Sequence, residues 1–270
     1  MTALVGPREA PDVHVMTFNI RRRMPRISRR SPDVWVRRAP ALRHLLRAER
    51  PALLGVQEAL PDQSRYVRSS LGDHYARLGH GRNANLGGEG CPIYVDLIRF
   101  EIVHWEQLWL SDTPTVPGSR SWGNQIPRVL VSARLRDKET SEELHFVNTH
   151  FDHRSRRSRV MAATLVASIS DERTIITGDF NSAVDTLPFA EFSAAGFPDT
   201  WDTAEERLTA EWGTYPNYRA PKLDRKRIDW ILGGAAIQPS VVGINTARFG
   251  GTFASDHLPV QAVVRVGSSR

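Results

Sequence analysis

Cysteine is nearly absent from this sequence: Cys91 is the only one among 270 residues. A single cysteine excludes a disulfide within the chain and suits a reducing compartment. Apolar runs long enough to cross a bilayer are also missing, and residues 1–11 lack the apolar stretch of a signal peptide. We therefore expect a cytoplasmic, monomeric protein with no membrane partner.

The composition is that of an ordinary globular protein. Hydrophobic residues make up 40% of the chain and charged residues 24%, with neither repeats nor low-complexity linkers. A chain of 270 residues is within the range of one large β-rich domain. We therefore expect a single domain over residues 1–270, with a core from about 13 to 265 and frayed ends at 1–11 and 267–270.

Apolar periodicity predicts strands alternating with a few helices. Residues 41–49 carry leucines on one helical face, and Pro40 is expected in the first turn of that helix. The pattern by itself indicates only mixed α and β structure. The expected helices are 41–49, about 155–170 and about 187–195, and the expected strands lie near 13–19, 53–57, 74–79, 92–98, 100–110, 127–136, 144–150, 174–178, 227–232 and 258–265.

Several of these apolar strands end abruptly in acidic, amide or imidazole side chains. Ile175 and Ile176, for example, lead into Asp179 and Asn181. Because side chains alternate along a strand, Asp179 and Asn181 are expected to point the same way while Phe180 points into packing. Such ends hold metal ligands and proton-transfer groups rigidly. The residues presented in this way are Asn19, Glu58, His150, Asp152, His153, Asp179, Asn181, Asp229, Asp256 and His257.

This set of side chains is rich in oxygen donors. Carboxylate and amide oxygens suit Mg²⁺ or Mn²⁺. Zinc is disfavoured, because the only thiol is Cys91 and no histidine pair has HExxH spacing. A hard cation in a protein of net charge +6 points to a phosphate-bearing substrate. The metal would neutralise a phosphoryl oxygen, and a carboxylate or His–Asp pair would activate water.

Each residue also has a structural interpretation. A strand-end Asp or Asn often only caps a turn, and for Asp179 or Asn181 taken alone this is the favoured interpretation. His150 and His257 could be buried histidines with satisfied hydrogen bonds. Asp229 could be the buried partner of a neighbouring arginine. The joint pattern reverses this preference, because turn caps alone do not explain so many polar strand ends in one chain.

The chain resembles the endonuclease/exonuclease/phosphatase superfamily from about residue 13 to 264. No single motif is decisive, but six occur in the family's order. The resemblance implies an α/β (α+β) fold, a four-layer α/β sandwich of two packed mixed β-sheets flanked by helices. The motifs are Phe18-Asn19, Gln57-Glu58, Asn148-Thr149-His150, Gly178-Asp179-Phe180-Asn181, Arg227-Ile228-Asp229-Trp230 and Ser255-Asp256-His257-Leu258-Pro259.

The resemblance also implies a metal site and a proton-transfer pair. Glu58 would be the principal metal ligand, with Asn19 beside it and Asp256 nearby. His257, oriented by Asp229, would act as a general base or would bind the scissile phosphate as an imidazolium.

Further roles follow from the same resemblance. Asp179 would position or deprotonate the attacking water, or protonate the leaving oxygen. Asn181 and His150 would donate hydrogen bonds to the phosphoryl oxygens. Glu89 would pair with His150, although a plain loop carboxylate is nearly as good an interpretation. Asp152 and His153 would line the phosphate pocket.

Basic residues are concentrated next to the polar strand ends. A rim of this kind fits nucleic acid and also polyanionic small molecules, and a solvated face is the alternative for each cluster. We expect all three clusters at the mouth of the site, with Arg22 binding substrate. The clusters are Arg21, Arg22, Arg23, Arg26, Arg29 and Arg30; then Arg154, Arg156, Arg157 and Arg159; and finally Arg219, Lys222, Arg225, Lys226 and Arg227.

Two loops are candidate substrate walls. Residues 111–127 are rich in Pro, Gly and Ser and carry Trp122 and Asn124, which we predict to bind substrate. Trp122 could stack on a base or pack the loop down, and the sequence favours neither. Residues 211–219 form the second candidate wall.

The sequence therefore predicts a phosphoesterase dependent on Mg²⁺ or Mn²⁺ that hydrolyses a P–O bond by in-line attack of water. The first expectation is a nuclease acting on DNA or RNA. The alternatives are a phosphatase or head-group phosphodiesterase acting on a small polyanionic or lipid-derived substrate, and a catalytically inactive nucleic-acid-binding protein.

Overall fold

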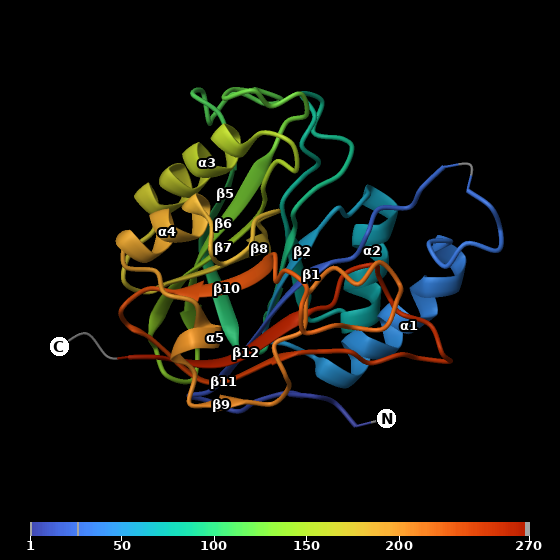
Figure 1. The fold of residues 1–270 in the computed structure, drawn as a ribbon. Coiled ribbons are helices and arrows are strands. Elements are labelled where there is room, and N and C mark those ends of the chain that lie inside the picture. Colours follow the sequence, from blue (N-terminus) through green and yellow to red (C-terminus); the bar gives the residue numbers. More distant parts are fainter. Residues whose placement is uncertain (1, 26, 268–270) are drawn as a thin grey trace.

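Two β-sheets lie face to face at the centre of the structure, a computed structural model that describes residues 2–25 and 27–267 (Figure 1). The seven-stranded sheet has the order β3 (Tyr75–Leu78), β4 (Ile93–Asp96), β2 (Leu53–Gln57), β1 (Val13–Asn19), β12 (Val260–Val266), β11 (Ile237–Ile244) and β9 (Glu206–Arg207). The five-stranded sheet has the order β10 (Asp229–Gly233), β8 (Thr174–Asp179), β7 (Glu143–His150), β6 (Val129–Asp137) and β5 (Phe100–Trp109).

Helices cover the outer faces of both sheets. Helices α1 (Trp35–Glu49) and α2 (Pro61–Leu71) pack on the seven-stranded sheet, and α3 (Arg156–Ser168) and α4 (Leu187–Ala194) pack on the five-stranded sheet (Figure 1). The short helix α5 (Thr200–Thr203) contacts β10 and β11. The fold is therefore the four-layer α/β sandwich that the sequence resemblance implied.

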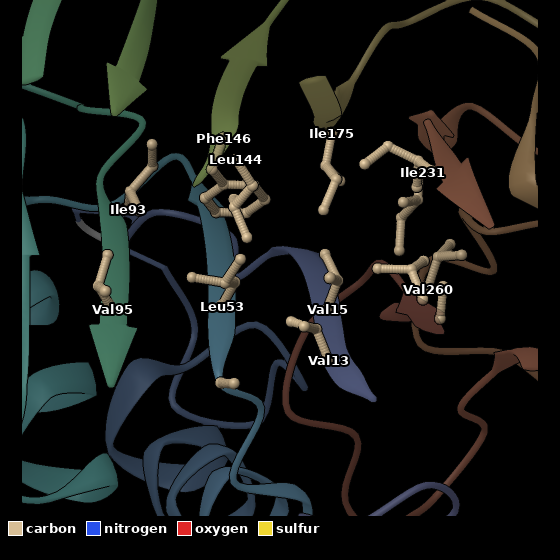
Figure 2. Close-up of a cluster of buried hydrophobic side chains, with 14 of the residues drawn as sticks. Val13, Val15, Leu53, Ile93, Val95, Leu144, Phe146, Ile175, Ile231 and Val260 are labelled. Carbon is tan, nitrogen blue, oxygen red and sulfur yellow. The ribbon is translucent and has the colours of Figure 1, made fainter. Parts of the chain in front are cut away.

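Strand alternation explains the layers. In β1, Val13 and Val15 point between the sheets, where they meet residues such as Ile175 and Ile231 of the opposite sheet (Figure 2). The intervening Met16 belongs to the cluster under α1 and α2. Residues of the five-stranded sheet alternate in the same way, because Phe180 and Trp230 belong to the cluster under α3 and α4. The core is therefore three apolar layers between four layers of secondary structure.

Toward one edge, the layer between the sheets becomes polar. Gln57 Nε2 donates hydrogen bonds to Asn148 Oδ1 at 2.7 Å and to Thr17 Oγ1 at 3.0 Å, so the network crosses from one sheet to the other. Gly55 lies beside it, and a Cβ atom there would fall 2.5 Å from both Asn148 Oδ1 and Thr177 Oγ1. Only glycine fits this close approach of the sheets. The polar network forms the floor beneath the strand ends.

Five helix and strand predictions need correction. Helix α1 begins at Trp35 rather than Ala41, so Pro40 lies inside the helix and not in its first turn. Helix α2 was not predicted, because several of its buried residues are polar and hide the apolar periodicity. Helix α5 and strands β9 and β11 were also not predicted. Within β11, Pro239 sits beside a register shift in the ladder.

The N-terminal segment is attached to the fold rather than frayed throughout. The backbone N–H groups of residues 4–6 donate to the buried carboxylate of Glu49 at 2.8–3.1 Å, and Asn245 Nδ2 donates to the same carboxylate at 2.8 Å. The expectation of fraying at 1–11 is therefore wrong for these residues. At the other end, residues 268–270 lie outside the described part of the chain. No helix within the described ranges is both long and apolar enough to span a bilayer.

A buried histidine makes folding sensitive to acid. His145 Nε2 lies 2.6 Å from Ser132 Oγ, and burial lowers the pKa of His145 to about 4. An unfolded chain takes up this proton below about pH 6.5, whereas the folded protein does not until about pH 4, so acid favours unfolding in that window. Urea titrations of His145→Gln should show a pH slope of the unfolding free energy smaller by about 1.4 kcal/mol per pH unit between pH 6 and 5. The exposed His104→Gln variant is the control, and equal slopes in both variants would contradict the prediction.

Candidate active site

The polar strand ends meet in one pocket at the edge where the two sheets come together. The pocket has a volume of about 460 Å³. It receives side chains from both sheets and from the loops that follow their strands. The lining residues are Arg21, Arg22, Glu58, Arg82, Glu89, Ile126, Arg128, His150, His153, Asp179, Asn181, Tyr215, Ile228, Asp256 and His257.

Alternation along the strands carries the polar groups to this position. Asn19 follows Val13 and Val15 on the inner face of β1, and Asp179 follows Ile175 on the inner face of β8. Asn19 Nδ2 donates to Asp179 Oδ2 at 2.9 Å and to Glu58 Oε1 at 3.1 Å. One amide therefore joins carboxylates from the two sheets and keeps them at a fixed separation.

The backbone is unusual at two strand ends. Glu58 has φ 61° and Asn181 has φ 50°. Asparagine tolerates this left-handed region, but a glutamate there costs on the order of 1 kcal/mol or more. Asn181 N–H also donates to Asp179 Oδ1 at 3.0 Å, which closes a turn and places both side chains in the pocket. Strain of this kind is typical of residues whose direction matters for function.

His257 forms a buried ion pair with Asp229. Its Nδ1 lies 2.9 Å from Asp229 Oδ2, and its Nε2 lies 3.8 Å from Asp179 Oδ2. Burial alone would lower the pKa of His257, but Asp229 and Asp179 outweigh burial and raise the pKa to about 10. The imidazole is therefore a cation at neutral pH and a donor from Nε2. Asp229 does not pair with Arg227, which instead binds Asp199 and Glu211.

Asp179 is poised to exchange a proton near neutral pH. Burial and the neighbouring charge of Asp229 raise its pKa to about 7, against the opposing effect of His257. A carboxylate with this pKa is a competent general base for water, because it is ionised in part and basic enough to hold the proton.

His150 is held as a neutral donor or acceptor. Burial, followed by the charges of Arg128 and Arg82, lowers its pKa well below the ordinary value. Asn181 Nδ2 lies 3.1 Å from His150 Nε2 and donates to Phe151 O at 3.1 Å. Because an amide nitrogen only donates, His150 accepts at Nε2 and carries its proton on Nδ1.

The donor set fits a hard divalent cation. Glu58 Oε2 and Asp256 Oδ2 lie 3.8 Å and 3.5 Å from the guanidinium of Arg21, so both carboxylates face the same cationic position. Burial would raise the pKa of Glu58, but the Arg22 N–H and the charge of His257 outweigh it and keep the pKa below its ordinary value. Asn19 lies beside Glu58, as expected, although its amide nitrogen rather than its oxygen faces the carboxylate.

A second group of donors lies deeper. Single ligand atoms of Asp179, Asp229 and His257 fall within 4.8 Å of one another. Asp229 Oδ1 is buried there and has no hydrogen-bond partner in the part of the chain that the structure describes. The protonated His257 makes this group less suitable for a metal than the Glu58–Asp256 pair, because an imidazolium has no lone pair to offer.

Not every predicted residue takes the expected position. Glu89 lies in the pocket, but its carboxylate pairs with Arg22 at 3.1 Å and Arg82 at 3.0 Å instead of His150. Asp152 is absent from the pocket lining and accepts hydrogen bonds from the N–H groups of Arg154 and Ser155 at the start of α3. His153 does line the pocket.

The loop that carries Trp122 and Asn124 does not place those two side chains in the pocket lining. Trp122 packs against the cluster under α3 and donates from Nε1 to Asp112 at 2.8 Å. This contact favours the packing interpretation over base stacking. The second predicted wall does reach the pocket through Tyr215, whose ring lies 4.9 Å from that of His257.

The basic clusters are less concentrated than expected. Arg21 and Arg22 line the pocket, Arg26 lies outside the described residues, and the described members of the second and third clusters are absent from the lining. Three arginines outside the predicted motifs and basic clusters lie in the pocket or support a loop beside it. Arg82 and Arg128 line the pocket, and the fully buried Arg38 donates to Ile20 O and Arg21 O, which fixes the loop after Asn19.

A family model decides the relationship. The model of the Endonuclease/Exonuclease/phosphatase family matches residues 16–257. The chain belongs to this family. Members of the endonuclease/exonuclease/phosphatase family are phosphoesterases.

Solved structures agree with this assignment. An endonuclease/exonuclease/phosphatase family protein from Bacteroides thetaiotaomicron is 28% identical, with a TM-score of 0.87 over 96% of this chain and 98% of that chain. A mannosyl-6-phosphatase from the same organism is 27% identical, with a TM-score of 0.85 over 93% and 99%. The D. rerio protein TDP2, solved with a single-strand DNA product, is 18% identical with a TM-score of 0.68 over 94% and 99%, a likeness of fold alone. No sequence among the curated proteins matches the chain significantly.

Proposed function

We propose that this protein is a divalent-metal-dependent phosphomonoesterase that removes a terminal phosphate from a small phosphorylated compound. The observation that carries the proposal is that one pocket holds two carboxylates for a hard cation, Glu58 and Asp256, and also Asp179 and His257 for proton transfer, with Asp229 bonded to His257 behind the lining. Hydrolysis of a phosphate ester needs both.

The proposed roles follow from charge. Glu58 and Asp256, with Asn19 beside them, would hold Mg²⁺ or Mn²⁺, which when bound would neutralise charge on the phosphoryl group. Asp179 would accept a proton from the attacking water, since its pKa of about 7 lets it do so at neutral pH. The His257 imidazolium, oriented by Asp229, would donate from Nε2 to a phosphoryl oxygen.

The neutral side chains of the pocket would complete the binding of the phosphoryl group. Asn181 and His150 lie on the opposite sheet from Glu58 and are held by their mutual hydrogen bond of 3.1 Å. A phosphoryl oxygen would bind here in exchange for one of these contacts, because both N–H donors of Asn181 are taken up by His150 Nε2 and Phe151 O.

A small monoester is favoured over a polynucleotide for two reasons. The arginine clusters that suggested a nucleic-acid track lie largely outside the pocket lining. In addition, a relative at 27% identity and 99% coverage is a mannosyl-6-phosphatase. A nuclease remains the second candidate, because a basic groove lined by Arg219, Lys222 and Arg225 adjoins Tyr215.

A substrate panel tests the proposal. With Mg²⁺ or Mn²⁺, sugar 6-phosphates and p-nitrophenyl phosphate should be hydrolysed with a kcat/KM at least about 100-fold above that of bis(p-nitrophenyl) phosphate, single-stranded RNA or plasmid DNA, which corresponds to about 2.7 kcal/mol of transition-state discrimination. The KM of the monoesters should depend only weakly on salt concentration. A substrate with one phosphate group releases few counterions when it binds. Faster cleavage of a nucleic acid, with a steep salt dependence, would favour the nuclease instead.

A further inference from the structure

Arg128 is a buried guanidinium with unused hydrogen-bonding capacity. The residue is 3% exposed, yet it lines the pocket. Its Nη2 contacts His153 Nδ1 at 2.9 Å, and its Nε lies 3.6 Å from Asp152 Oδ2. Among the described residues, Nε and Nη1 have no hydrogen-bond partner. A buried charged donor without a partner is costly, so this side chain is arranged to meet an acceptor that the protein itself does not supply.

Arg82 lies next to Arg128 at the same end of the pocket. Its Nη2 pairs with Glu89 at 3.0 Å, and its backbone carbonyl accepts a hydrogen bond from Trp109 Nε1 at 2.7 Å, so both ends of the residue are fixed. Glu89 is shared with Arg22 and therefore neutralises neither arginine fully. This end of the pocket consequently keeps an excess of positive charge beside His150.

The arginine end of the pocket narrows. It adjoins an extension of about 10 Å³, whose lining includes Arg82, Arg128, Cys91 and Val129. A space of that size holds no more than one water-sized group. A phosphate oxygen fits against the two guanidinium groups, whereas the second ester arm of a phosphodiester has no room to continue past them.

We propose that Arg128 and Arg82 form an anion subsite that binds the non-bridging oxygens of a terminal phosphate and so selects the doubly charged monoester over the singly charged diester. This inference rests on the proposed phosphomonoesterase function and names the residues that would give it its specificity. Arginine suits the role, because its planar donors match phosphate oxygens in pairs.

The neighbouring imidazole agrees with this placement. Burial contributes most to the low pKa of His150, and the charges of Arg128 and Arg82 contribute next. Both arginines therefore lie close to His150, which in turn faces Asn181 and Asp179. A phosphate held between His150 and the arginines would therefore be adjacent to the proton-transfer groups. The alternative is that Arg128 is purely structural and only supports Asp152 at the start of α3.

Direct binding of inorganic phosphate separates the two interpretations. Calorimetric titration in excess EDTA removes both metal and turnover from the measurement. The wild-type protein should bind phosphate, and Arg128→Gln should weaken binding about 10- to 100-fold, as expected for loss of charge-assisted hydrogen bonds. Arg128→Lys should recover part of the affinity. Arg134→Gln, on the strand that begins just after Arg128 but paired with Asp171 and absent from the pocket lining, should bind like wild type.

Kinetics with metal supply the second readout. Arg128→Gln should lower kcat/KM for p-nitrophenyl phosphate about 100-fold and for bis(p-nitrophenyl) phosphate by less than about 3-fold. Unchanged phosphate affinity in a folded Arg128→Gln variant would overturn the subsite. If that variant does not fold, Arg82→Gln provides the same comparison, and unchanged affinity there has the same meaning. Arginine-dependent phosphate binding without hydrolysis of any ester would instead reject the proposed function and leave the subsite standing.

Discussion

Replacing His257 by alanine is expected to lower kcat by about 10²–10⁴-fold, the usual range for an acid–base group. Two effects act together. The donor to the phosphoryl oxygen is lost, and the buried carboxylates of Asp179 and Asp229 lose the cation that lies between them. Without that cation their mutual repulsion raises the pKa of Asp179 further, so less of the general base is ionised at neutral pH. Steady-state kinetics on the best monoester measures the effect.

Matched variants separate these contributions. Asp179→Ala should also cost about 10²–10⁴-fold in kcat, because it removes the base itself. Asp229→Asn should cost less than His257→Ala if Asp229 only orients and charges the imidazole. The exposed His104→Ala should be unaffected, and circular dichroism should show a folded protein in each case, since these side chains lie at strand ends outside the apolar clusters. Near-wild-type turnover in either alanine variant would remove that residue from the mechanism.

Removal of divalent metal is expected to abolish hydrolysis. Glu58 and Asp256 converge on one cationic position, and a phosphoryl group cannot approach these carboxylates without a cation to offset their charge. Excess EDTA should therefore reduce activity to background, and Mg²⁺ or Mn²⁺ should restore it.

A binding measurement locates the metal independently of turnover. Calorimetric titration with Mn²⁺ should show one clear binding event in the wild-type protein and a large loss of affinity in Glu58→Gln. Cys91→Ser should bind metal normally, because burial raises the pKa of that thiol to about 12 and leaves it protonated. Full activity in EDTA, or unchanged Mn²⁺ affinity in Glu58→Gln, would reject the proposed metal site.

The strands and their polar ends were predictable because each signal is local. An apolar run such as Ile175–Ile176, followed by Asp179, predicts both a buried strand and the residue at which that strand ends. The convergence of these ends was predictable only through the order of six motifs, since a sequence pattern does not state which strands face one another. In the structure, side chains that follow strands of both sheets line one pocket.

The residues that were missed lack a local signal. Arg82 and Arg128 sit in or beside loops, and nothing in their neighbourhood distinguishes a buried arginine from the many exposed ones. Several buried residues of α2 are polar, so its helical periodicity was not visible in hydrophobicity. Gln63, for example, accepts a hydrogen bond from Arg23 N in the loop after Asn19, a long-range contact that a single sequence does not contain.

The close approach of the sheets at Gly55 has a consequence for catalysis. Asn19 and Glu58 belong to one sheet, while His150 and Asp179 belong to the other, and the Gln57–Asn148 hydrogen bond of 2.7 Å joins the sheets just below them. Under the proposed mechanism, the distance between the two sheets sets the distance between the proposed metal ligands and the proposed proton-transfer groups. A change in that distance would therefore alter activity even if none of these residues were replaced. Gly55 does not line the pocket, but it helps to set the width of the proposed active site. A side chain at this position would push the two sheets apart.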